Sequence, residues 1–273
     1  MRKQQDVVMG MIKNYRFTIS YDGTRYYGWE HQPNTDMTIQ GKIESVLAKM
    51  LIGEKYGDSS DKDDELIKAY IPEVLCAGRT DAGVHAEAMI ASVKLESGYS
   101  AKEILDYCNR YLPDDICIKD VVVAGDRFHA RYNACGKTYR YKCYIGETKP
   151  VFDRKYVYTL DKKPDVEQMK KAAALLIGEH DFKSFCSNPK MKKSTVRLVD
   201  KIDIRVDGDY LSLTYHGSGF LQYMVRIMTG TLLEVGWGKR TPESMTELLE
   251  AKDRRLAGET APAQGLTMVK VDY

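Results

Sequence analysis

Cys76-Ala77-Gly78-Arg79-Thr80-Asp81-Ala82-Gly83-Val84-His85 is the stretch around which the chain is organised. A short apolar segment, residues 74–77, leads into a polar loop whose aspartate has one glycine three residues before it and another two residues after it. Glycine lets the backbone turn sharply and lets a ligand come close. The stretch therefore predicts a strand end at which the Asp81 carboxylate is presented with little bulk around it.

The segments on either side of this loop alternate between strand and helix patterns. Before the loop, residues 15–21 alternate as a strand, and Thr38 is a candidate N-cap for the helix that follows. After it come a strand over residues 89–95, a helix opened by a Ser100–Glu103 capping box, and a strand over residues 116–123. This half reads βαββαβ.

The second half repeats the order without repeating the sequence. It predicts strands at 137–145 and 266–271, helices at 165–177 and 221–235, a short helix opening at Thr241-Pro242, and a hairpin turning at Asp207-Gly208. We expect an α+β fold of two ferredoxin-like, RRM-like halves, residues 13–128 and 129–273. The halves should form a central mixed or antiparallel sheet with flanking helices and a cleft between them.

Composition excludes several classes of protein. None of the apolar runs in the 273 residues approaches the ~20 needed to span a bilayer, and residues 1–14 lack the apolar centre of a signal peptide, so we expect a cytoplasmic protein. The six cysteines form no Cys-x-x-Cys pair, which argues against a zinc site and a disulfide framework. We expect mostly buried free thiols, with no metal and no organic cofactor.

The charge is unevenly distributed. Residues 54–65 hold six acids against two lysines and are interpreted as a surface insertion, so the rest of the chain is more basic than the net charge of +2 indicates. Two stretches, 127–146 and 182–199, contain only basic charges. Such clusters suit a phosphate backbone, but they are equally typical of solvated surfaces.

The candidate site residues are ambiguous when each is taken alone. Asp81 is either a reactive carboxylate or a turn-former bonded to its own backbone, and His85 is better explained as a structural residue. The aromatic cluster 26–29, beside Arg25, could stack on bases or cap a core. Tyr139 lies on an apolar strand face typical of a core, whereas Arg226 lies off the apolar stripe of its helix and can face a cleft.

Taken together, the chain resembles the tRNA pseudouridine synthases of the TruA type. The resemblance runs from about residue 15 to the carboxyl terminus and rests on separated stretches in the same order. These are Tyr21-Asp22-Gly23 with Tyr26-Tyr27-Gly28-Trp29, Cys76 to His85, Phe128-His129-Ala130-Arg131, Tyr139-Arg140-Tyr141, Gly219-Phe220 with Met224-Val225-Arg226, and Gly265-Leu266.

The resemblance implies isomerisation of uridine to pseudouridine at positions 38–40 of the tRNA anticodon stem-loop by a homodimer, with base flipping and a covalently acting Asp81. It implies that Arg226 is the positive partner of Asp81 and that Tyr139 lies against the uracil and takes its C5 proton. Leu266 would lie on the other side of the base, and Arg79 would fill the gap that the flipped base leaves. The basic and aromatic residues near Arg25, His129 and Arg131 would bind the RNA.

Two other functions use the same residues. A non-catalytic RNA-binding protein with two RRM-like halves would need the basic and aromatic side chains but not Asp81. A pseudouridine synthase acting on a different RNA would need all of them. The segments 30–36 and 186–194 fit the family pattern loosely, and they are plausible regions of substrate contact.

Overall fold

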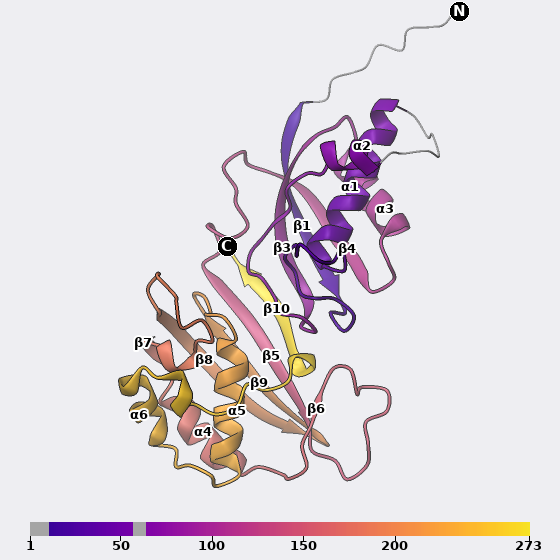
Figure 1. Cartoon of the computed structure of the whole chain (residues 1–273). Helices are drawn as coiled ribbons and strands as arrows, with labels where there is room; N and C mark the ends of the chain where they lie inside the picture. Colours follow the sequence, from indigo (N-terminus) through magenta and orange to yellow (C-terminus); the bar gives the residue numbers. More distant parts are fainter. Residues whose placement is uncertain (1–10, 57–63) are drawn as a thin grey trace, which may run out of the picture. The chain divides into compact units, whose positions relative to one another are not determined.

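The computed structural model describes residues 11–56 and 64–273, which form two compact units (Figure 1). The first unit runs to Ala82 and takes in Ala86–Asn133. The second consists of Gly83–His85 and Ala134–Tyr273. Three residues that directly follow the Asp81 segment therefore belong to the second unit.

The first unit is an antiparallel sheet with helices. Its strands lie in the order β4-β1-β3-β2, and its helices α1 and α3 cover the sheet (Figure 1). The elements are β1 (Ile12–Tyr21), α1 (Ile39–Tyr56), α2 (Asp64–Ala69), β2 (Leu75–Cys76), β3 (His85–Glu96), α3 (Ala101–Tyr111) and β4 (Ile116–Ala124).

Local sequence signals account for these elements. The alternating side chains of β1 are buried on one face, namely Tyr15, Phe17, Ile19 and Tyr21. The Thr38 hydroxyl accepts a hydrogen bond from the Gly41 N–H at 3.1 Å, which confirms the predicted N-cap of α1. The Ser100–Glu103 capping box of α3 is also confirmed, with both of its reciprocal hydrogen bonds present.

The second unit is a longer sheet with its own helices. Its strands lie in the order β10-β5-β9-β8-β7, with antiparallel pairing, and the short β6 pairs in parallel with β5. The elements are β5 (Gly136–Tyr144), β6 (Tyr158–Thr159), α4 (Val166–Ala174), β7 (Gly178–Asp181), β8 (Val196–Asp207), β9 (Tyr210–Gly217), α5 (Met224–Gly236), α6 (Ser244–Ala251) and β10 (Leu266–Asp272). The expected α+β class is confirmed.

The predicted hairpin is present, and three helix boundaries differ from prediction. Gly208 has φ +54° between β8 and β9, as a tight hairpin turn requires. Helix α4 ends at Ala174, because residues 175–177 continue with tighter bonds to the carbonyl three residues back. Helix α5 begins at Met224 rather than at residue 221, because Tyr223 has a left-handed conformation with φ 60°. Helix α6 begins at Ser244 rather than at Thr241-Pro242, because residues 244–246 bond to the carbonyl three residues back.

Three further predictions concern segments and side chains outside these elements. The surface insertion expected at 54–65 falls largely on residues 57–63, which lie outside the described residues. Four of the six cysteines are buried and all six are free thiols, as expected. Among the described residues, no helix is long and apolar enough to cross a membrane.

Candidate active site

The Asp81 loop, residues 77–82, is held to the core of the first unit through Thr80. Thr80 is buried, and its hydroxyl lies 2.7 Å from the Tyr21 hydroxyl of β1. Its carbonyl accepts a hydrogen bond from the Trp29 N–H at 3.0 Å. The residue before Asp81 is therefore fixed through both its side chain and its backbone, which restricts where the carboxylate can lie.

Gly28 makes a close backbone approach to the same loop. Its φ is +96°, and a Cβ atom at this position would lie 2.8 Å from the Thr80 carbonyl oxygen and 3.2 Å from the Asp81 carbonyl carbon. Both the left-handed conformation and the lack of space require glycine. Gly28 and Thr80 were not among the candidate site residues predicted from sequence, although both lie in stretches that carry the family resemblance.

The aromatic cluster before α1 divides into core and surface residues. Tyr26 and Trp29 are 2% and 1% exposed, and the Trp29 ring lies 6.1 Å from that of Tyr21. These two residues therefore belong to the core, and their rings are not accessible for stacking on RNA bases. Tyr27 is 57% exposed and is the aromatic residue of this cluster that remains accessible.

Two of the three arginines predicted to contact RNA in this unit form ion pairs at its surface. Arg79 pairs with Glu30, which follows Trp29, and Arg25 pairs with Asp115. Asp115 also accepts a hydrogen bond from Tyr26 at 2.6 Å, and burial together with this bond raises the pKa of Tyr26 to about 12. Exposed pairs of this kind contribute little stability.

His129 and Arg131 occupy a turn after β4. The Arg131 N–H donates to His129 Nδ1 at 3.0 Å, and the His129 ring lies 4.2 Å from that of Tyr132. Arg131 is exposed, and Tyr132 is 77% exposed. The turn thus presents a guanidinium and an aromatic ring side by side at the surface, which is a combination suited to an RNA strand.

His85 has a structural environment. It is buried, its Nε2 lies 3.1 Å from the Lys155 carbonyl and 3.2 Å from the Gln264 carbonyl, and its ring packs on Tyr156 at 5.1 Å. Gly83, two residues earlier, has φ +78°. The interpretation of His85 as structural agrees with these contacts.

Arg226 is anchored within the second unit. Its Nε donates to the Ala261 carbonyl at 2.8 Å, and its guanidinium lies 4.8 Å from the centre of the Tyr223 ring. Its own carbonyl accepts the Ala261 N–H at 3.1 Å. The left-handed backbone of Tyr223 is a costly conformation for a residue with a side chain, and here it places an aromatic face against Arg226.

Tyr139 and Leu266 lie on neighbouring strands of the same unit. Leu266 on β10 is directly opposite Tyr141 on β5, and Tyr139 is two residues along β5, so Tyr139 and Leu266 share a face as diagonal neighbours. Both are buried, and the Tyr139 ring meets the Phe220 ring edge-on at 5.3 Å.

Tyr141, which was not among the candidate site residues predicted from sequence, connects these residues. Its hydroxyl donates to the Pro262 carbonyl at 2.7 Å. Burial raises its pKa, and the nearby charge of Arg226 acts in the opposite direction. The second unit therefore gathers Arg226, Tyr139 and Leu266 around one buried tyrosine, whereas Asp81, Arg79 and Arg25 belong to the first unit.

Comparison with known proteins gives a consistent set of relatives. The family model described as tRNA pseudouridine synthase matches residues 172–273. A protein of Bacillus sp. (strain KSM-64) named tRNA pseudouridine synthase A is 42% identical, with 96% of this chain and 100% of that protein covered. A protein of the same name from Geobacillus sp. (strain WCH70) is 42% identical, with 96% of this chain and 99% of that protein covered.

A more distant relative covers the same length. The protein named tRNA pseudouridine synthase A 2 from Clostridium perfringens is 38% identical over 96% of this chain and 100% of its own length. Among solved structures, a chain in a Cbf5-Nop10-Gar1 complex is similar at a TM-score of 0.34 and 12% identity, covering 93% of this chain and 49% of that chain. The sequence relatives extend over almost the whole chain.

Proposed function

Because this chain belongs to the tRNA pseudouridine synthase family, we propose that it isomerises uridine to pseudouridine at positions 38–40 of the tRNA anticodon stem-loop. The observation that carries this proposal furthest is the fixation of the Asp81 loop by Thr80 and Gly28. An aspartate that only forms a turn would need neither the hydrogen bond between Tyr21 and Thr80 nor the close backbone approach of Gly28. A reacting group does need it, because small displacements of a reacting atom are costly.

In the proposed reaction the Asp81 carboxylate attacks either the uracil ring or the ribose anomeric carbon. The bond between N1 and the anomeric carbon breaks, and the detached base turns. A bond from C5 to that carbon forms, and the bond made by Asp81 breaks, which releases the free carboxylate. Tyr139 then takes the C5 proton while N1 gains one, so the product is an isomer of the substrate. The attack requires an ionised carboxylate, and burial alone would raise its pKa.

We assign the compensating positive charge to Arg226, whose position is set by Ala261 and Tyr223. Gly83, two residues after Asp81 in the sequence, already belongs to the second unit. His85 contacts the Gln264 carbonyl, two residues before Leu266.

We also propose that both units, taken as domains 13–128 and 129–273, are ferredoxin-like halves with a cleft between them. Counting the four principal strands of each unit in chain order, both sheets run fourth-first-third-second. This order and the antiparallel pairing support the proposal. The cleft would receive the flipped uridine, with Leu266 and Tyr139 against the base.

Exposed basic and aromatic side chains would bind the RNA. Arg79, Arg25, Arg131 and His129 are the candidates in the first unit, and extrusion of the uridine costs a few kcal/mol that such contacts must offset. We propose that Arg79 leaves Glu30 to fill the gap in the RNA arm. The family resemblance further supports a cytoplasmic homodimer that needs neither metal nor organic cofactor.

The test is tritium release from C5-labelled uridine in tRNA. Wild type should release tritium, and Asp81→Ala should release none above background while still binding tRNA. Asp120→Ala, which removes an exposed carboxylate from β4, is the matched control and should keep wild-type activity. Equal release by wild type and Asp81→Ala would refute the role of Asp81, and binding without release by wild type would favour a non-catalytic RNA-binding protein. Mapping pseudouridine in tRNA from a deletion strain would distinguish this substrate from another RNA.

A further inference from the structure

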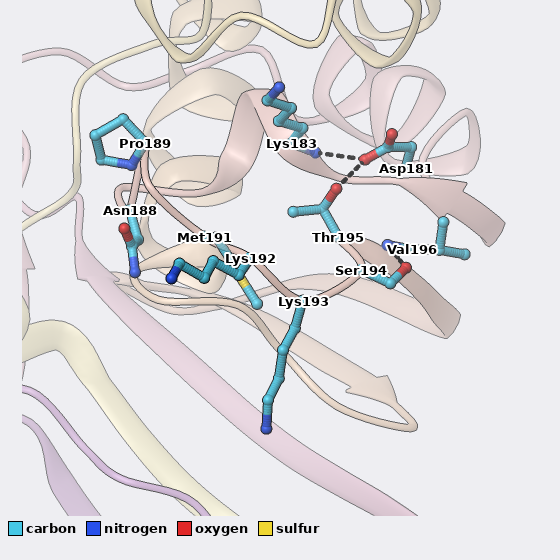
Figure 2. Close-up of a pocket in the computed structure, with 10 residues that line it drawn as sticks. All are labelled: Asp181, Lys183, Asn188, Pro189, Met191, Lys192, Lys193, Ser194, Thr195 and Val196. Atoms are coloured by element: carbon cyan, nitrogen blue, oxygen red, sulfur yellow. Dashed lines mark hydrogen bonds between the residues drawn. The ribbon is translucent and has the colours of Figure 1, made fainter.

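A basic hollow lies in the second unit between the end of β7 and the start of β8. It has a volume of about 290 Å³ and is lined by Asp181, Lys183, Val196 and most of the lysine loop, which we define as residues 187–195 (Figure 2). The loop carries Lys190, Lys192 and Lys193, and these three side chains are exposed, as is Lys183. None of the residues that the proposed reaction uses lines this hollow.

The positive charge of this surface is not neutralised within the described residues. None of its four lysines, Lys183, Lys190, Lys192 and Lys193, forms an ion pair with a residue that the structure describes. Asp181 is the acid in the lining, and it is already engaged by Lys252 at 3.0 Å and by the Thr195 hydroxyl at 2.5 Å. The surface therefore keeps its capacity to attract an external anion.

The direction of the side chains indicates what kind of anion would fit. Figure 2 shows Lys183, Lys192 and Lys193 extending in different directions from the backbone instead of converging on one point. A single phosphate would need convergent donors, whereas a polyanion presents charges at regular intervals along a strand. Flexible, separated ammonium groups suit the second case.

The lysine loop is also connected to the segment that carries Arg226. The Ser187 N–H and hydroxyl lie 3.2 and 3.4 Å from the Gln222 carbonyl, one residue before Tyr223. At its other end the loop is closed by a hydrogen bond from the Phe182 N–H to the Thr195 carbonyl at 3.1 Å. A strand bound here would thus lie on a loop attached directly to the start of α5.

We propose that the lysine loop, with Lys183, is an RNA-backbone surface that holds phosphates of the substrate outside the reacting nucleotide. This inference rests on the proposed function, because it names a further contact with the same substrate. Each phosphate that a lysine neutralises contributes a slope of about 0.7–0.9 in a plot of log affinity against log salt. The surface acts on binding and does not touch the reacting atoms.

The test compares two double variants with wild type. Lys192→Gln/Lys193→Gln removes two charges from the lysine loop, and Lys162→Gln/Lys163→Gln removes two neighbouring exposed lysines elsewhere in the same unit. Binding of unmodified tRNA transcript is measured between 50 and 200 mM salt, with the single-turnover rate at saturating tRNA. Both proteins should bind more weakly as the salt concentration rises. From the slope per phosphate, the fold loss of affinity between the two salt concentrations should be ~10 times smaller for the lysine-loop variant than for wild type.

The outcomes separate this inference from the proposed function. The inference is supported if the lysine-loop variant binds more weakly and with a smaller salt slope, at an unchanged saturated rate, while the control double variant behaves as wild type. Identical salt slopes for all three proteins would overturn it, as would displacement of tRNA by inorganic phosphate beyond the effect of ionic strength, which would indicate a single-anion site. Absence of pseudouridine formation by wild type would refute the proposed function alone, since binding is measured separately.

Discussion

The Asp81 loop and the lysine loop are proposed to act on the same RNA, and they are held in opposite ways. The Asp81 loop is fixed in its middle. Thr80 is buried there, and the backbone of Gly28 approaches so closely that a side chain at position 28 would not fit. The lysine loop is fixed at its ends, and its charged side chains extend into solvent. The difference follows from the two tasks, because a reacting carboxylate needs one position and a phosphate contact tolerates many.

Among the substitutions that test how tightly each region is held, Gly28→Ala should have the largest effect, because it lowers both stability and rate. The positive φ costs about 1–2 kcal/mol for a residue with a Cβ atom, and the 2.8 Å approach to the Thr80 carbonyl adds to this cost. We expect lower stability in urea unfolding and a loss of about 10²-fold in the single-turnover rate, since the Asp81 loop must move.

Gly208→Ala is the matched control for this prediction. Gly208 also has a positive φ, +54°, but nothing lies within 4 Å of the Cβ position. It should therefore lose stability without losing rate. Equal rates for the two variants would show that the close approach of Gly28 does not fix the position of the Asp81 loop.

Arg226→Lys tests whether the single-turnover rate also depends on Arg226, a second side chain that is held in place. The ammonium group cannot reproduce both the hydrogen bond to Ala261 and the stacking on Tyr223. We expect the single-turnover rate to fall by about 10²-fold with tRNA affinity unchanged. Arg254→Lys, which alters another partly buried arginine bonded to a backbone carbonyl, should keep the rate. An unchanged rate for Arg226→Lys would remove Arg226 from the proposed site.

Tyr21→Phe probes the fixation of Thr80 with a smaller change. It deletes one hydroxyl and leaves the buried Thr80 hydroxyl without that partner, which costs about 1 kcal/mol. We expect about a tenfold lower rate at most. In the second unit, Tyr215→Phe removes a similar bond, 2.8 Å long, to Thr229, which retains a bond to the Val225 carbonyl. Its effect on both stability and rate should therefore be smaller than that of Tyr21→Phe.

The smallest expected effect concerns Asp181, the acid that lines the hollow at the lysine loop. Burial raises the pKa of Asp181, but hydrogen bonds from Thr195 and Lys252 outweigh it, so the net shift is downward. A carboxylate with a depressed pKa contributes stability above its ordinary pKa near 3.9, and this contribution is lost as the pH falls through the folded value. Wild type should therefore be more stable than Asp181→Asn at neutral pH, and the difference should shrink below about pH 4.

Chemical unfolding over a pH series measures that difference. Asp161→Asn, at an exposed position, should leave stability unchanged at every pH. A constant gap between wild type and Asp181→Asn down to pH 2 would contradict the assignment.

Features that depend on neighbours in sequence could be predicted from sequence alone. The alternation of β1, the Thr38 N-cap, the Ser100 capping box and the turn at Gly208 are local patterns, and the structure contains all four. The start of α5 was misplaced because the apolar stripe continues through Leu221, and no local signal marks the left-handed backbone of Tyr223.

The candidate site was less accessible to such reasoning. Asp81 could be singled out from its flanking glycines, but its supports, Tyr21 and Gly28, lie more than 50 residues earlier in the chain. Pattern alone could not decide that Trp29 and Tyr26 are core residues, since an aromatic side chain fits a core or a base equally well. Tyr141 was overlooked because its role depends on Pro262 and Arg226, which belong to distant elements.

The burial of His85 has a consequence for the order in which the protein matures during synthesis. Its ring contacts carbonyl groups 70 and 179 residues later in the chain. A nascent chain can fold much of its first unit early, because domains generally fold as the ribosome releases them. His85 finds its last partner only after Gln264 has emerged, so the segment beside Asp81 is completed near the end of translation. The growing polypeptide thus carries Asp81, the aspartate proposed to react, in an unfinished setting until almost the whole protein exists.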